Sequence, residues 1–467
     1  MPEPRMAPSR PPRSFAGPII LILLGVFFLL GNLNVIAWRQ LGWYFARWWP
    51  LLIILWGTIK LVEYYQARQA GTVAPRIGAG SIFLVIFLVM IGMSASTASR
   101  VNWGALNDNI QVNGDDEVIN FLGGRTFNYD SEKVGDLNGA TSLRINSNRG
   151  AVNVIAWDEP RIKVVSHKKV ITTSEEEAKK LDANTQPTIN VSGESATVDT
   201  NTSVETHVVI FGSDIRYVRT DVEVYVPKKV TVQVDTRHGD VTVRDRAADV
   251  RVTDQHGDVT LEQIAGNATV DLSHGDLRAS DVSGDISVSG RLNDTTLADI
   301  GGAARFSGDF FGEMNLSKVA KGVTFRSSRT DMSMARLDGD LSLQSGDLKV
   351  KSVVGPFRVS TKSKDIHLED INGDIQVQNT NGVVEIAATK PVKISVENRN
   401  NDVIVTLPAK AAFQYNLRAR QGEISSDFPD FQVNNERHEN SATGTVGNGG
   451  PKIDVTNQHG NVEIRKS

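Results

Sequence analysis

Three histidines recur at equal distances along the chain. The tripeptide His-Gly-Asp starts at His238, His256 and His274, which are separated by equal 18-residue intervals. If the repeat folds as stacked β-coils, the three imidazoles lie above one another at the interstrand spacing of about 4.8 Å. Imidazole nitrogens are common zinc ligands, but zinc needs them at about 2 Å, with a fourth ligand or a water. Zinc binding is the first chemistry that this spacing could serve.

A repeated turn is the better explanation of these histidines. The same position before glycine is held elsewhere by small or polar residues, namely Ser283, Ser307, Asp338, Ser345, Asn372, Asn381 and Gln421. A tight corner needs glycine because glycine tolerates positive φ, and the preceding residue needs only to be small or polar. His459 in NQHGN repeats the turn near the end of the sequence. We therefore interpret the histidines as turn residues and predict no metal site.

The acidic residues raise two further possibilities, calcium binding and catalysis. Calcium-binding β-rolls have nine-residue units that read GGxGxDxUx. Here a unit such as HGDVTVRDR supplies one glycine and one corner aspartate, too few oxygens for a six- to eight-coordinate ion. A solenoid hydrolase or lyase would need carboxylates clustered with Lys or Arg on one face, and no Ser-His-Asp, HExxH or phosphate-loop motif occurs. We predict that the protein is not an enzyme and has no catalytic residue or cofactor.

The histidines belong to a longer pattern with a nine-residue step. Each turn is followed by two apolar residues separated by one polar residue, which is the in-out-in pattern of a short strand. The first apolar position holds Val241, Val250, Val259, Ala268, Leu277 and Ile286, and the second holds Val243, Val252, Leu261, Val270, Ala279 and Val288. Thr242, Arg251, Thr260, Thr269, Arg278 and Ser287 lie between them. The strict step predicts strands of equal length in equal register.

The frame continues toward the C-terminus with two irregularities. It slips around SGDFFGEMNLSKVAKG, and a seven-residue step separates Leu341 from Leu348. Phe310 and Phe311 fall at the slip, where they are either the aromatic tips of a bulged loop or fillers of an irregular core. The later pairs are Val323/Phe325, Met332/Met334, Leu341/Leu343, Leu348/Val350, Phe357/Val359, Ile366/Leu368, Ile375/Val377 and Val384/Ile386.

A nine-residue unit cannot enclose a core, so the units must stack along an axis. The fold predicted for residues 236–467 is an all-β solenoid, resembling a parallel β-helix or β-roll, with about nine residues per strand-turn unit. The 18-residue recurrence of histidine favours two strands per coil, and three-sided coils remain possible. We expect the final pair of strands, PKIDVTNQHGNVEIRKS, to cap the open end, because an uncapped coil offers unpaired backbone groups to other chains.

Residues 142–235 read as irregular strands that precede the solenoid. LRINSNRG, AVNVIAW and RIKVVSHKKV alternate apolar and polar residues, as half-buried strands do. One short helix interrupts them in TTSEEEAKKL, where Ser174 and Glu177 form a capping box. Residues 99–141 are polar and rich in glycine, which predicts a spacer with some local structure.

The first hundred residues contain three apolar stretches, Gly17–Ile36, Trp48–Val62 and Ile77–Met93, each near the length that a bilayer core requires. We expect three transmembrane helices within 17–98, after a cytoplasmic tail at 1–16. Basic residues are concentrated in the tail and in the loop between the second and third stretches, so the positive-inside rule puts the chain after Arg100 outside the cytoplasmic membrane. Alternatively, Arg13 to Ala37 is a cleaved signal peptide, which would still leave two apolar segments as an anchor.

The remaining chain is acidic, with 41 basic and 52 acidic side chains in residues 101–467. A nucleic-acid-binding protein would need a basic face to neutralise phosphates. The charge balance therefore argues against a nucleic-acid partner.

Two stretches of the chain resemble known families. From about Ser142 to the end the sequence resembles a bacterial family of adhesin-like domains of unknown function, for which a β-solenoid is predicted. The segments that carry the resemblance are LRINSNRGAVNVIAW, SEEEAKKL, VEVYVPKKVTVQVDTRHGDVTV, the serial Gly-Asp turns, LPAKAAFQYNLRARQGEISSDF and GNVEIRKS. Residues 17–65 are similar to the transmembrane region of LiaI/LiaF-type cell-envelope stress proteins. The matching motifs are structural, so they imply an architecture and no site residue.

Together these features predict a non-enzymatic cell-envelope protein, anchored in the cytoplasmic membrane, that displays an adhesin-like solenoid outside for binding or scaffolding. Its expected partners are the membrane itself and an envelope polymer or a membrane protein. The alternative is an envelope-stress regulator whose membrane helices contact a partner such as a sensor kinase. A third possibility is polymerisation through end-to-end stacking of solenoids.

Overall fold

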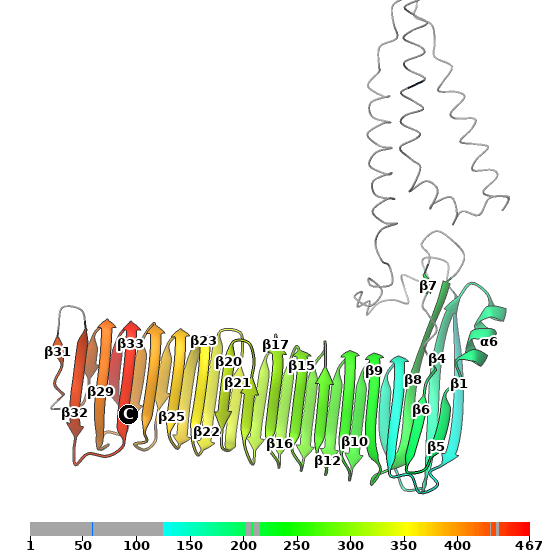
Figure 1. Ribbon diagram of the computed structural model, residues 1–467, viewed down its shortest axis with the longest axis horizontal. Helices are drawn as coiled ribbons and strands as arrows, with labels where there is room; N and C mark the ends of the chain where they lie inside the picture. Colours follow the sequence, from blue (N-terminus) through cyan, green and yellow to red (C-terminus); the bar gives the residue numbers. More distant parts are fainter. Residues whose placement is uncertain (1–57, 59–124, 202–206, 209–214, 430, 436–438) are drawn as a thin grey trace, which may run out of the picture. The chain divides into compact units, whose positions relative to one another are not determined.

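The computed structural model describes residue 58 and residues 125–201, 207–208, 215–429, 431–435 and 439–467 (Figure 1). Residues Arg125–Thr206 and Arg216–Ser467 form one compact unit. The three expected transmembrane segments lie outside the described residues apart from Thr58. No helix within the described ranges combines the length and the hydropathy needed to cross a bilayer.

The unit consists of two long sheets, here called sheet A and sheet B, whose strands are given in stacking order. Sheet A contains β1 (Arg125–Asp136), β4 (Arg161–Thr172), β8 (Ile215–Pro227), β3 (Val152–Trp157), β10 (Val241–Arg246), β12 (Val259–Ile264), β14 (Leu277–Val282), β16 (Thr295–Ile300), β18 (Met314–Val319), β21 (Leu337–Leu343), β22 (Asp347–Val354), β24 (Asp365–Asn372), β26 (Val384–Ala387), β28 (Val403–Leu407), β34 (Val462–Lys466) and β30 (Ile424–Ser426). β7 covers His207–Val208.

Sheet B contains β5 (Thr188–Ser192), β6 (Ser195–Asp199), β2 (Ser142–Arg149), β9 (Thr231–His238), β11 (Val250–His256), β13 (Ala268–Leu272), β15 (Ile286–Leu292), β17 (Ala304–Phe310), β19 (Val323–Arg326), β20 (Thr330–Met334), β23 (Phe357–Ser363), β25 (Ile375–Asn381), β27 (Ile394–Asn400), β33 (Lys452–His459), β29 (Phe413–Gln421), β32 (Asn440–Val446) and β31 (Asn434–Asn435).

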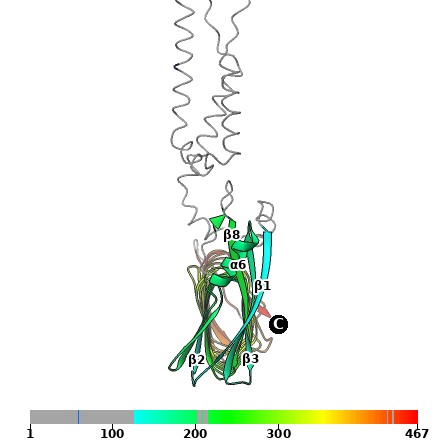
Figure 2. The ribbon, with the colours of Figure 1, turned by 90° about the vertical axis from the view of Figure 1, so that its right-hand side faces the viewer.

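The chain alternates between the two sheets, so that each coil has two sides. Val241 on β10 pairs with Val259 on β12, and Val250 on β11 pairs with Ala268 on β13, so each partner lies one 18-residue repeat further along the chain. Seen end-on in Figure 2, the two sheets face each other around a narrow interior. This confirms a solenoid with two strands per coil and a nine-residue strand-turn unit.

The interior is filled by the in-facing residues of the nine-residue frame. Val241, Val252 and Leu261 are fully buried, and their columns continue along both sheets. Burying one such side chain contributes about 1.5–3 kcal/mol. Because each strand supplies only a few inward residues, a single coil has too little core and depends on its neighbours.

The corners explain the His-Gly-Asp tripeptide. Gly275 has φ +148°, and a Cβ on it would lie 1.9 Å from the carbonyl oxygen of Gly257 one coil earlier. The corner aspartates bond from coil to coil, because the backbone N–H of Asp276 donates to the carboxylate of Asp258 at 2.9 Å. The same bond joins Asp258 N–H to Asp240 at 3.0 Å. Glycine is required for close stacking, and aspartate accepts an N–H of the next corner.

The slip in the frame is the insertion of one residue into a coil. Thr295 pairs with Met314 and Ala304 with Val323, which makes a 19-residue offset in place of the 18-residue one. The two phenylalanines at this place differ in exposure: half-buried Phe310 packs against the core with its ring centroid 5.0 Å from that of Phe325, whereas Phe311 is 67% exposed. Phe310 therefore fills space beside the core, and Phe311 is the exposed aromatic tip.

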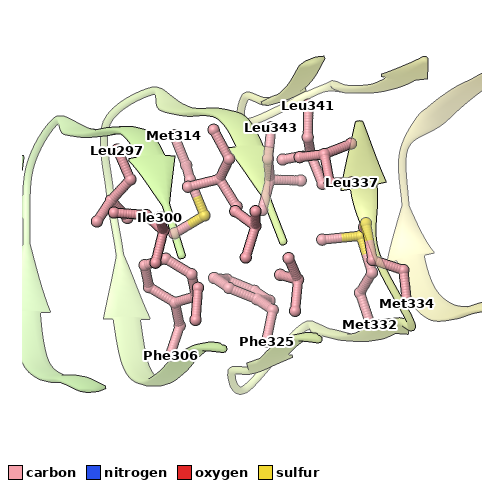
Figure 3. Close-up of a cluster of buried hydrophobic side chains, with 14 of the residues drawn as sticks. Leu297, Ile300, Phe306, Met314, Phe325, Met332, Met334, Leu337, Leu341 and Leu343 are labelled. Atoms are coloured by element: carbon pink, nitrogen blue, oxygen red, sulfur yellow. The ribbon is translucent and has the colours of Figure 1, made fainter. Parts of the chain in front are cut away.

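The solenoid reverses its winding at one coil, which the sequence pattern did not indicate. β20 is antiparallel to both β19 and β23, and β21 is antiparallel to both β18 and β22. The chain makes a hairpin within sheet B, crosses to sheet A, makes a second hairpin, and resumes the original direction. Figure 3 shows that the interior continues through this coil, where Met332, Met334 and Leu337 extend the core next to Phe325.

The last strand pair does not cap the solenoid, and this expectation was wrong. β33 lies between β27 and β29 in sheet B, and β34 lies between β28 and β30 in sheet A, with parallel pairing on both sides. The end of sheet B is covered instead by β32, which pairs antiparallel with β29, and by β31. The terminal pair has the same inward pattern as any other coil, so it fits into the interior of the stack.

The opposite end of the unit carries the single helix of the compact unit's described residues, α6 (Glu175–Asn184). Half of the predicted capping box is present, since the Ser174 hydroxyl accepts the N–H of Glu177 at 3.3 Å. The Glu177 carboxylate instead accepts from the Thr172 hydroxyl at 2.9 Å and from Arg216 at 2.8 Å. Ala178 and Leu181 of α6 pack with Val170 and Val218 in a separate small core. The segment expected to be a spacer contributes β1 to sheet A, because every residue of β1 pairs with β4.

Candidate functional site

The three histidines stack at one corner of sheet B, as the 18-residue spacing predicts. The ring centroids of His238 and His256 are 4.9 Å apart, and those of His256 and His274 are 5.0 Å apart, with interplanar angles of 6° and 4°. The lone pair of an imidazole nitrogen lies in the plane of its ring, so parallel stacked rings direct their lone pairs side by side and cannot aim them at one ion. This geometry favours the turn interpretation of the histidines.

Metal ligands do not gather elsewhere in the described part of the chain either. No three His, Cys, Asp or Glu residues among those described lie close enough together to hold an ion. The prediction that the chain has no metal site stays a prediction, and the same holds for the predicted absence of catalytic and cofactor-binding residues.

A buried carboxyl lies under the histidine corner and was not identified from the sequence. Asp254 occupies the third inward position of β11, is 1% exposed, and pairs with Thr236 on β9 and Leu272 on β13. Burial raises the pKa of Asp254 to about 7, although backbone N–H groups of His256 and Gln255 stabilise the ionised form. Its Oδ2 has no hydrogen-bond partner among the described residues.

On three strands in the second half of the solenoid the same position holds asparagine. Asn379, Asn398 and Asn457 form a buried column on β25, β27 and β33. Their Nδ2 groups donate to carbonyl oxygens of the corner, for example from Asn379 to Lys364 at 2.9 Å and from Asn457 to Asn401 at 2.8 Å. An amide satisfies corner carbonyls that an ionised carboxylate cannot, because a carboxylate has no donor.

A polar groove lies on the outer face of sheet B. Its volume is about 540 Å³. The hairpin that reverses the chain between β19 and β20, with residues 327–329 at its turn, forms one wall. The floor consists of β23, β25, β27 and β33, whose out-facing side chains include Lys362, Gln378 and Arg399.

The groove has two parallel rows of side chains. One row, at the corner side, contains Lys362, Thr380, Arg399 and Gln458, and the other contains Asp331, Ser360, Gln378, Glu397 and Thr456. Within the described residues neither Lys362 nor Arg399 forms an ion pair, although both are exposed. The Gln378 amide donates weakly to Glu397 at 3.4 Å. The groove therefore offers free cations beside hydrogen-bonding amides, hydroxyls and carboxylates.

Sequence reasoning placed the histidine corner correctly and missed both the buried polar column and the groove. The column had a readable signal, because VRVTD, IQVQN, ISVEN and IDVTN each end their apolar alternation on an inward Asp or Asn. The groove had no such signal in the sequence, because its wall results from the winding reversal.

Two family models match the chain. The Toastrack DUF4097 model matches residues 140–288 and again 275–465, which together are well over half of the chain. The chain belongs to the Toastrack family. A second model, that of the LiaF transmembrane domain, matches residues 16–104. The protein is thus a membrane protein whose Toastrack region is a β-solenoid, and both resemblances noted in the sequence are confirmed.

Three solved structures are similar to the chain, each aligned with 73% of it. The first is a candidate cell adhesion protein from Clostridium sporogenes ATCC 15579, with 12% identity, a TM-score of 0.17 and 100% of that chain covered. The second is a candidate adhesin from Bacteroides fragilis NCTC 9343, with 10% identity, a TM-score of 0.17 and 97% of that chain covered. The third is a candidate adhesin from Parabacteroides distasonis ATCC 8503, with 11% identity, a TM-score of 0.20 and 97% of that chain covered. No curated protein matches the chain.

Proposed function

We propose that this Toastrack protein is a non-enzymatic binding protein, anchored in the cytoplasmic membrane, whose solenoid lies on the outer side and holds envelope material. The observation that carries the proposal is the outer face of the second half of sheet B. Parallel pairing there aligns polar side chains of β23, β25, β27 and β33 in rows, with neighbours about 4.8 Å apart. Such rows suit an extended polymer with regularly repeated polar groups better than a compact small molecule.

Topology is the first test of the proposal. Reporters that are active only inside or only outside the cytoplasm are fused after Ser99 and after Ser467 in the full chain. Both fusions are expected to report the outside, because three spanning segments follow a cytoplasmic tail. If both report the cytoplasm, the proposal fails, since the solenoid could not meet envelope material.

Binding is the second test. The full-length protein and a version in which residues 1–100 are replaced by an unrelated membrane anchor are both incubated with fragmented cell-wall material. A binding protein of the proposed kind retains the material with either anchor. If the version with the unrelated anchor no longer retains the material, the second candidate function below is favoured.

The second candidate function is regulation of a membrane partner such as a sensor kinase. It rests on the match of residues 16–104 to the LiaF transmembrane domain. In this case the membrane segment contacts the partner and the solenoid reports the state of the envelope.

A further inference from the structure

The groove on sheet B is a product of the winding reversal, and this sets its position. Regular coils leave the outer face of a solenoid flat, but the hairpin turn at residues 327–329 stands beside the floor and gives it a wall. Thr330 at the base of the hairpin is fixed, because its hydroxyl bonds that of Thr361 at 2.9 Å and its N–H donates to Ser327 at 3.0 Å. The wall is therefore held against β23.

The two cations in the corner-side row of the groove lie on alternate strands. Lys362 on β23 and Arg399 on β27 lie in one row with Thr380 of β25 between them. They are two strand spacings apart, which is about 10 Å. Arg329 in the wall adds a third cation without an ion pair to any residue that the structure describes. A linear ligand that lies across the strands would meet Lys362 on β23 and, two strands further on, Arg399 on β27.

The second row of the groove, which contains Gln378, indicates which kind of polymer would fit. Asp331 and Glu397 are exposed acceptors, and Gln378 between them offers both an amide donor and an acceptor. Hydroxyl groups of a sugar can donate to these carboxylates, whereas a continuous polyphosphate has no donor to offer them and would place a charge beside them on every unit. The lining is polar and has no aromatic residue, which argues against a stacking platform for nucleic acid bases.

We propose that this groove binds an extended glycan strand that carries one carboxylate per disaccharide, with each carboxylate on a cation of the Lys362 row and the hydroxyls on the Gln378 row. A β-1,4-linked disaccharide is close in length to two strand spacings, so the charges of the strand and of the groove are in register. The inference rests on the proposed function, since it names the polymer class and the place where the solenoid holds it.

The test uses full-length protein in detergent micelles and three soluble probes. The first is peptidoglycan glycan strands freed of peptide, which carry a lactyl carboxylate on every muramyl residue. The second is a chitin oligosaccharide, which has the same linkage without the carboxylates, and the third is polyglycerol phosphate, which has charges without sugar rings. Binding is measured by calorimetry for the native protein and for the double variant Lys362→Gln/Arg399→Gln.

The carboxylated strands are expected to bind best, and the double variant to bind them at least about tenfold more weakly, because charge-assisted hydrogen bonds are lost. A matched control, Arg358→Gln/Lys349→Gln, removes two exposed cations outside the groove and is expected to leave affinity unchanged. Gln378→Trp fills the floor without altering charge and is expected to abolish binding of the strands.

The other outcomes separate the inference from the function on which it rests. If the native protein binds cell-wall material but the groove variants bind it equally well, the groove assignment is wrong and the proposed function stands. Equal affinity for the chitin oligosaccharide refutes the role of the cations. Tighter binding of polyglycerol phosphate refutes the glycan. If the native protein retains no envelope material at all, the proposed function itself fails.

Discussion

The buried carboxyl of Asp254 makes the stability of the solenoid depend on pH. Both its Oδ2 and the carbonyl oxygen of Gly239 lie close to the point that a Cβ on Gly257 would occupy, at 2.8 and 2.4 Å. An ionised carboxylate thus shares this corner with a carbonyl oxygen, and only the protonated carboxyl has a hydrogen to donate. We predict that Asp254→Asn stabilises the protein at neutral pH, because the column of Asn379, Asn398 and Asn457 already shows how an amide fits.

The magnitude and the sign of the change in stability with pH follow from the pKa of Asp254. The pKa of Asp254 rises from the ordinary value of 3.8 to about 7 in the folded protein, so between these values the folded state keeps a proton that the unfolded chain has lost. Stability contributed by this group is therefore present at low pH and is lost as the pH rises from about 4 to about 7. With about 1.36 kcal/mol for each pKa unit, the loss is roughly 4 kcal/mol, complete above pH 7.

Hydrogen exchange of β11 is the assay, because unfolding of a repeat protein need not be two-state. Exchange of the amides of residues 250–256 is followed by mass spectrometry between pH 4 and pH 8 and corrected for the intrinsic rates. Asp254→Asn is expected to match the native protein near pH 4 and to exceed its protection at pH 8 by an amount that approaches roughly 4 kcal/mol. The matched control is Asp271→Asn, an exposed carboxylate on β13.

Two results would refute this reasoning. If protection of native β11 does not fall between pH 4 and pH 7, the buried carboxyl is not held protonated. If Asp271→Asn changes the pH dependence as much as Asp254→Asn does, the effect belongs to the net charge of the chain and not to the buried group.

Three further predictions concern the corners and the core. Gly275→Ala is expected to destabilise the solenoid by about 3 kcal/mol or more, since φ is +148° and the new Cβ would meet the Gly257 carbonyl; a thermal melting curve that matches the native one would contradict the close stacking. Arg246→Met is expected to lower the free energy of unfolding by about 3 kcal/mol, because three carbonyls would lose their donor. The buried guanidinium donates to the carbonyls of Val226, Pro227 and Val230 at 3.0, 2.5 and 2.8 Å. The measurement is urea denaturation, and an unchanged midpoint would show that water replaces the donor. Zinc is expected to leave the melting temperature of the native protein unchanged, and a rise that His256→Asn abolishes would show that the histidine corner binds metal.

The solenoid could be predicted from the sequence because it depends on which positions are apolar, and the histidine corner could be predicted because the His-Gly-Asp turn recurs at equal intervals. Inward residues at Val241, Val250 and Val259 specify register, whereas the 18-residue recurrence favoured two strands per coil and left three-sided coils open. Ser174 was sufficient for the helix start because the hydrogen bond of an N-cap hydroxyl is a local interaction.

The direction of a strand and its place in the stack could not be predicted in the same way. An in-out-in pattern is identical when it is read in either direction, so Met332/Met334 on the reversed strand β20 look like any other pair. The seven-residue step before Leu348 accompanies the second hairpin, but the first hairpin keeps the nine-residue step from Val323 to Met332, so the step length does not mark a reversal. The groove depends on this reversal and could not be predicted for the same reason.

The insertion of β33 and β34 separates the order in which coils are synthesised from the order in which they stack. Residues 413–426 are made before residues 452–466, yet they can join the parallel stack only after the later segment has paired with β27 and β28. Until then the edges of β27 and β28 stay open to other chains, and the closing contacts span long stretches of sequence, which slows folding. A chain truncated before residue 452 would keep these edges exposed, so the end of the stack can close only in a molecule whose C-terminal segment is present.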